Sequence, residues 1–168
     1  TGDFQYEAIT EASFELEELC ADIESLRANP QINFSAKPFE KLPASALNLS
    51  VSLWRNGQNL LAKTDESNES DYLLWAVSGL EDLANELIYI YSPSTESYLR
   101  IKEAGDHVPT KVCWGYNNRT CAFRIPTTDP TLIRIENRII SADSNPLAAC
   151  SATLFAIYHG IQNKLCVN

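Results

Sequence analysis

Two short segments alternate between apolar and polar residues, and this period of two constrains the fold more than any other feature of the chain. Residues 47–53 place a leucine or valine at every second position, with asparagine and serines between them. Residues 133–138 alternate isoleucine or asparagine with Arg134, Glu136 and Arg138. Because successive side chains of a strand point to opposite faces, each segment predicts a strand with one apolar and one polar face.

The remaining elements are predicted from apolar periodicity and from helix-terminating residues. Helices are expected at residues 13–29, 71–91, 94–100 and 145–164, the last one opened by Asn145 and Pro146. Further strands are expected at residues 4–10, 32–36, 112–114, 120–125 and 132–139, and an Asn-Gly turn at residues 56–57. The predicted fold class is α+β, an antiparallel β-sheet with helices packed on one side, in a single domain spanning residues 1–168.

The net charge of the chain restricts the kinds of partner that it can bind. Lys and Arg total 13 against 22 Asp and Glu, a formal net charge of −9. Binding to nucleic acids or to anionic membranes needs a basic protein surface, and an acidic chain lacks one. Neither partner is therefore expected. No apolar run approaches the length of a membrane span. The odd number of cysteines, without CxxC spacing, predicts free and mostly buried thiols in a reducing, cytoplasmic compartment.

Arginine is concentrated between residues 100 and 138 of this otherwise acidic chain. Arg119 and Arg124 flank one predicted strand, and Arg134 and Arg138 flank Glu136 on another. One interpretation is a surface ion-pair ladder of little energetic value. The other is a face whose guanidinium groups bind phosphate or carboxylate, with the carboxylate available to a divalent cation that bridges phosphates.

Seven segments resemble motifs of the glutamine synthetase family, in the same order. Asn118–Pro126 resembles NRSAxxRIP, Arg134–Arg138 with Ala142–Pro146 resembles RIExR and DxxANPY, and Gly160–Lys164 resembles GIxNK; upstream, Gln5–Glu7, Lys37–Pro38, Ser52–Gly57 and Ser97–Arg100 resemble GQxE, KP, SLWxDGxN and NSYKR. The resemblance covers almost the whole chain and implies the C-terminal catalytic domain of that family, with its glutamine synthetase/guanido kinase-like fold. The chain opens without an initiator Met and contains no Met at all, so we expect a fragment, without the N-terminal β-grasp domain of the family.

The resemblance implies an ATP-dependent ligation of ammonia or an amine to glutamate or a related carboxylate, through an acyl phosphate. ATP and Mg²⁺ or Mn²⁺ are the implied cofactors. By this resemblance, Glu7 and Glu136 would be metal ligands, and Arg100 and Arg138 would bind the substrate. ATP and its phosphates would be bound by Arg119, Arg124, Arg134 and Ser52. Arg119 and His107 would take part in catalysis. The family assembles into rings, so a ring homo-oligomer is expected of the full-length protein, and a monomer or dimer of this chain alone.

Several positions depart from the family pattern. Asn48 and Ser50 stand where the family has a metal-binding histidine and a nucleotide-contacting histidine, and Pro43–Ala44 replaces its glutamate-binding Asn-Gly pair. The flap glutamate aligns with His107, or with Asp106 if the gap is moved. Three hypotheses follow: a divergent ligase that is impaired or inactive as this chain alone, a degenerate homologue that binds nucleotide or phosphate as a regulatory or interaction module, and a structural remnant with an ion-pair face.

Overall fold

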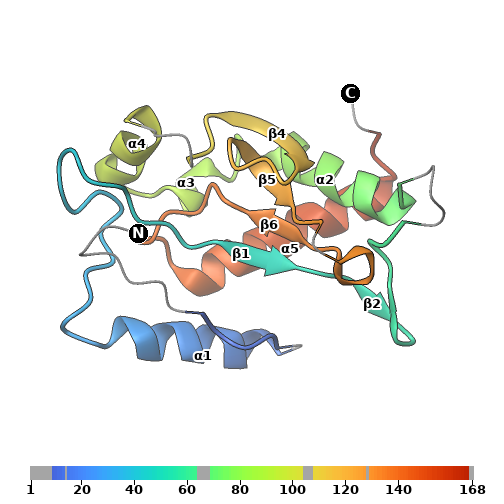
Figure 1. The fold of residues 1–168 in the computed structure, drawn as a ribbon, viewed down its shortest axis with the longest axis horizontal. Coiled ribbons are helices and arrows are strands. Elements are labelled where there is room, and N and C mark those ends of the chain that lie inside the picture. Colours follow the sequence, from blue (N-terminus) through green and yellow to red (C-terminus); the bar gives the residue numbers. More distant parts are fainter. Residues whose placement is uncertain (1–8, 14, 64–68, 104–107, 128, 167–168) are drawn as a thin grey trace.

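The computed structural model describes residues 9–13, 15–63, 69–103, 108–127 and 129–166. The chain folds into one four-stranded sheet, one small hairpin and a set of helices, which Figure 1 shows in sequence colours. The bounds are α1 Leu16–Arg27, β1 Leu49–Val51, β2 Trp54–Arg55, β3 Gln58–Asn59, α2 Asp71–Leu83, α3 Ile88–Tyr91, α4 Thr95–Lys102, β4 Lys111–Tyr116, β5 Cys121–Ile125, the 3₁₀ helix η1 Pro130–Leu132, β6 Ile135–Asn137 and α5 Pro146–Asn163.

The α+β prediction is confirmed, and the sheet is mixed where an antiparallel one was expected. The strand order is β1-β6-β5-β4; β6 is antiparallel to both β1 and β5, whereas β4 and β5 run parallel. The chain leaves β4 at Asn117, whose φ of 51° is left-handed, and residues 117–120 return it to the start of β4. Parallel strands normally need a much longer connection, so this arrangement could not be inferred from the spacing of the two strands.

The sheet buries one face against helices. Side chains such as Leu49, Phe123 and Ile135 are at most 8 % exposed and belong to one connected core with residues of α2 and α5. Figure 1 shows α2 and α5 behind the sheet, and α1 beside α5 at the lower edge of the view. The prediction of helices on one side of the sheet therefore agrees with the structure.

Helices α2 and α5 approach so closely that their backbones touch. A Cβ atom added to Gly160 would lie 2.0 Å from the carbonyl oxygen of Trp75, and one added to Gly79 would lie 2.2 Å from that of Ala156. No side chain fits between the helices at this crossing, because real Cβ atoms essentially never come within 3.0 Å of another heavy atom.

Three predicted elements differ from the observed ones. The helix expected at residues 71–91 is divided into α2 and α3, because the Ala84 N–H bonds to the Glu81 carbonyl in a tighter 3₁₀ pattern that ends α2. Residues 32–36 form no strand: the side chain of Asn33 accepts a bond from the Ser35 N–H, which bends the backbone. The strand expected at residues 132–139 is limited to β6.

Other predicted elements agree with the structure. The hairpin of β2 and β3 turns at residues 56–57, where both φ angles are positive, as an Asn-Gly type I′ turn requires. The side chain of Asn145 caps α5 by accepting from the Ala148 N–H at 2.9 Å.

The strand predicted at residues 4–10 falls largely outside the described residues, and the described residues 9 and 10 are not in a strand.

Candidate anion-binding face

The polar face of the sheet is organised around Glu136, at the centre of β6. Strand register places Ser50 of β1 and Arg124 of β5 directly opposite Glu136 on its two sides. Asn48 and Ser50 are exposed, whereas the alternate residues Leu49 and Ile135 are buried. The period-two prediction for residues 133–138 therefore agrees with the structure: the isoleucines face the helices, and Glu136 lies on the opposite face of the sheet.

Two arginines bind the two oxygens of Glu136. Arg124 Nη1 lies 2.9 Å from Oε2, and Arg138 Nη1 lies 3.0 Å from Oε1. The three side chains are only 10–19 % exposed, so water screens the pairs much less than it screens ion pairs at the surface. Among the described residues, two guanidinium groups thus share one carboxylate.

The donor capacity of Arg124 is not exhausted by this pair. Its Nε is buried and has no hydrogen-bond partner among the described residues. A guanidinium group has five donors in a planar fork that suits phosphate and carboxylate, so part of the Arg124 fork is uncommitted.

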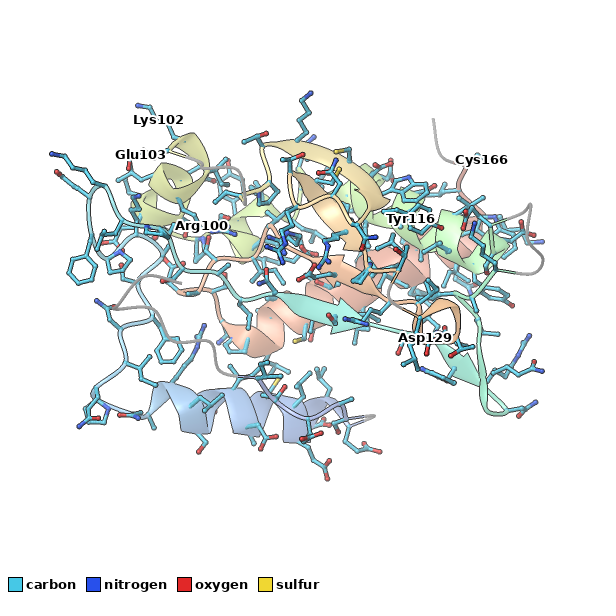
Figure 2. The ribbon with its side chains drawn as sticks, in the orientation of Figure 1. Arg100, Lys102, Glu103, Tyr116, Asp129 and Cys166 are labelled. Atoms are coloured by element: carbon cyan, nitrogen blue, oxygen red, sulfur yellow. The ribbon has the colours of Figure 1, made fainter. Side chains whose placement is uncertain are left out.

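Arg100, which the family resemblance assigns to substrate, is buried at 3 % exposure beneath this face. Its terminal nitrogens donate to the carbonyl oxygens of Arg138 and Ile139, each at 2.9 Å. Burial, with a smaller contribution from neighbouring Arg138, lowers the pKa of Arg100 to about 10. In the structure Arg100 therefore holds the backbone that carries Arg138; Figure 2 shows it between α4 and the sheet.

A second anchor ties α4 to the segment after β6. Ser94 and Ser97 form a capping box at the start of α4, and both hydroxyl groups donate to the carboxylate of Asp143. Asp143 and Ser97 lie within family-like motifs, yet the sequence assigned neither of them a role. Their motif positions were the only signal, because a contact between residues so far apart in sequence is decided by the tertiary fold.

The other predicted site residues that are described lie at different places. Arg134 immediately precedes β6 and is partly exposed, and Arg119 is exposed on the segment that joins β4 to β5. Ser52 is exposed at the end of β1, where its hydroxyl accepts a bond from Trp54 Nε1 at 2.9 Å. Glu7 and His107 lie outside the described residues.

The described residues do not by themselves fit a divalent metal. Both oxygens of Glu136 are bound to guanidinium groups, and no group of three or more His, Cys, Asp or Glu side chains suited to a metal occurs in the described part of the chain. Asn48 contributes only an amide oxygen near this face, which is a weak ligand compared with the imidazole at that position in the family.

The fold and this face define a class of protein: an α+β scaffold whose sheet presents, among the described residues, arginines paired to the carboxylate of Glu136. Residues 25–168 match the family described as glutamine synthetase, catalytic domain. The chain therefore belongs to the glutamine synthetase family and is part of its catalytic domain. No described helix is long and apolar enough to cross a membrane.

Individual relatives support the assignment. γ-Glutamylputrescine synthetase of Escherichia coli K12 is 37 % identical over 133 residues, which are 79 % of this chain and 28 % of that protein. The glutamine synthetases of Neisseria gonorrhoeae and Pyrococcus abyssi are 35 % and 33 % identical, again over 79 % of this chain and over 28 % and 29 % of their own lengths. The chain thus spans less than a third of the curated relatives that it matches.

Proposed function

We propose that the protein containing this chain is an ATP-dependent carboxylate–amine ligase, and that the face around Glu136 receives phosphate and carboxylate groups of its substrates. The observation that carries this proposal is the placement of Arg124 and Arg138 on the two oxygens of one poorly exposed carboxylate, with Arg134 two residues before that carboxylate in the sequence. A surface ladder of ion pairs would be more solvated than this cluster and would not need the buried support of Arg100.

The proposed division of labour follows from position. Arg124 and Arg138 are held in place by Glu136, so little order has to be gained when an anion binds beside them. Arg119 and Arg134 are more exposed, and they supply further positive charge to the transferring phosphoryl group. When bound, ATP supplies the phosphoryl group that activates the carboxylate as an acyl phosphate; the residues of this chain bind and orient that group.

Metal ions are part of the proposal only at the level of the whole protein. Mg²⁺ or Mn²⁺ is implied by the family, but Glu136 would have to exchange a guanidinium partner for a metal ion, and Asn48 is a poor substitute for histidine. Further ligands would come from Glu7 and from parts of the protein beyond this chain.

The names of the matching relatives suggest which amine substrates to test. One matching relative is named for γ-glutamylputrescine and others for glutamine, so a diamine and ammonia are the two amines to compare. We further propose a cytoplasmic ring homo-oligomer for the full-length protein. Light scattering on that protein would measure its assembly.

The proposal is tested by titrating ATP with Mg²⁺ or Mn²⁺ into the full-length protein and by following ADP release with glutamate plus ammonia or putrescine. Arg134→Gln and Arg119→Gln are each expected to weaken nucleotide binding about tenfold, since one charge-assisted hydrogen bond contributes about 1.5 kcal/mol. Lys164→Gln, an exposed charge at the end of α5 on the other side of the sheet, is the matched control. Equal binding by all three variants would contradict the proposed site.

A second candidate is a homologue that binds nucleotide or phosphate without ligation. The observation that favours it is that both Glu136 oxygens are engaged by arginine while Asn48 occupies the position of a metal-binding histidine. Nucleotide binding without ADP release for either amine would support this candidate and refute the ligase, whereas ADP release that depends on the amine would do the reverse.

A further inference from the structure

The five cysteines are free and fall into two neighbouring pairs and one exposed single thiol. Cys113 of β4 faces Cys121 of β5, Cys20 of α1 faces Cys150 of α5, and Cys166 is exposed near the end of the chain. The two pairs differ in access: Cys113 is partly exposed, whereas Cys20 and Cys150 are 7 % and 1 % exposed.

An irregularity in the parallel pairing brings Cys113 toward Cys121. Lys111 is paired with Cys121 and Trp114 with Phe123, so three steps along β4 match two steps along β5. In a regular ladder, Cys113 would be a diagonal neighbour of Cys121 with the Cα atoms about 8 Å apart, which is too far for a disulfide. The bulge shortens this diagonal, because the point of β5 opposite Cys113 then lies less than two residues from Cys121.

The position of the Cys121 sulfur supports the same contact independently. A Cβ atom built on Gly115 would lie 3.3 Å from Cys121 Sγ. Gly115 and Cys113 lie two residues apart on β4, on either side of Trp114. Cys121 Sγ therefore lies against the part of β4 that contains Cys113 and Gly115, and the glycine provides the space for it.

We propose that Cys113 and Cys121 form a redox-active dithiol, which closes to a disulfide by exchange with a low-molecular-weight disulfide such as oxidised glutathione. The Cys113 thiolate attacks one glutathione sulfur, the glutathione S–S bond breaks, and one glutathione thiolate leaves and takes up a proton. Cys121 then loses its proton and attacks the Cys113 sulfur, which expels the second glutathione thiolate. Two protein thiols are oxidised to one disulfide, and one glutathione disulfide is reduced to two thiols.

Exposure decides the order of the two attacks. Cys113 is accessible to a tripeptide disulfide, whereas Cys121 is only 4 % exposed and can react only with a sulfur already attached to its neighbour. The closed form would cross-link the two ends of the segment that carries Arg119, and so restrict that segment. The dithiol does not depend on the function proposed above.

The sequence makes the cross-link easy to detect. Trypsin cuts after Lys111, Arg119 and Arg124, which places Cys113 in peptide 112–119 and Cys121 in peptide 120–124. The full-length protein would be incubated with oxidised glutathione, alkylated with iodoacetamide in denaturant, digested without reductant and analysed by mass spectrometry. We expect peptides 112–119 and 120–124 joined by a disulfide that dithiothreitol removes, with glutathione on Cys166 and alkylated thiols at Cys20 and Cys150.

Two variants separate this mechanism from unspecific oxidation. Cys121→Ser should lose the cross-link and accumulate glutathione on Cys113, because the second attack is missing. Cys113→Ser should lose the cross-link and leave Cys121 unmodified, because no thiol near it is accessible; circular dichroism would verify that both variants fold. The proposal is overturned if Cys113 and Cys121 stay free while Cys166 is modified, if Cys113 of the unaltered protein carries only glutathione, or if Cys20 and Cys150 cross-link equally fast.

Discussion

Replacing Gly160 with alanine is the most direct test of the packing between α2 and α5. The new methyl group would lie 2.0 Å from the Trp75 carbonyl oxygen, where ordinary contact begins at 3.4 Å. The obstacle is backbone of another helix, so rotation of a side chain cannot relieve the overlap. The two helices would have to separate by on the order of 1 Å, which loosens close packing along the crossing.

Two effects of opposite sign compete in this substitution. Helix propensity alone predicts that Gly160→Ala stabilises the protein by about 1 kcal/mol. Forcing an extra methyl group into a packed interface costs about 1–3 kcal/mol or more, and the upper part of that range applies because both partners are backbone. We therefore expect a net loss of about 2 kcal/mol, which lowers Tm by roughly 6 °C for a domain of this size.

The assay is thermal and urea unfolding of the purified protein, followed by far-ultraviolet circular dichroism. Ser151→Ala, on the exposed side of α5, is the matched control and should be neutral or slightly stabilising. Gly79→Ala should resemble Gly160→Ala, and the double variant should cost less than the sum, since one separation of the helices relieves both overlaps. An unchanged or higher Tm for Gly160→Ala would refute the backbone contact.

Three further predictions concern the polar residues. Glu136→Gln should cost about 3 kcal/mol in unfolding free energy, since it leaves Arg124 and Arg138 facing each other without their shared carboxylate. Asn145→Ala should cost about 1 kcal/mol through loss of the α5 cap. Glu81→Gln should stabilise the protein at pH 7, because burial raises the pKa of Glu81 and so disfavours its charged form in the folded state; this advantage should shrink as the pH falls and Glu81 takes up its proton.

All three predictions are measured by urea unfolding, the last one across pH 4–8. If Glu136→Gln lowers the free energy of unfolding no more than the same substitution at an exposed glutamate such as Glu17, the ion pairs of Glu136 are solvated. Retention of full stability in Asn145→Ala would mean that another group caps α5. A Glu81→Gln advantage that grows toward low pH would have the wrong sign for a carboxyl group with a raised pKa.

Local patterns accounted for much of the secondary structure and for one side of the candidate site. The alternation at residues 133–138 placed Arg134, Glu136 and Arg138 together, because the period of a strand is a property of the backbone. The cap at Asn145 and the turn at residues 56–57 were equally local, since each depends on the conformations of a few consecutive residues.

Contacts between distant segments were beyond such patterns. Nothing in the sequence near Arg124 specifies Glu136 as its partner, because strand register is set by the packing of the whole sheet. The same holds for Arg100: the family resemblance implied a substrate contact, whereas the structure buries its guanidinium group against the carbonyl oxygens of residues 138 and 139. Its role toward substrate stays a prediction.

The sequence by itself determined the family, the α+β class and the polar face of β6, since these depend on residue order and on the short periods of strands and helices. Only the tertiary structure decided the parallel pairing of β4 with β5, the backbone crossing of Gly79 and Gly160, and the approach of Cys113 to Cys121. Each of these features is a contact between two segments, and the conformational preferences of the single segments do not specify it. Such contacts arise when the chain buries its apolar surface and satisfies its polar groups together.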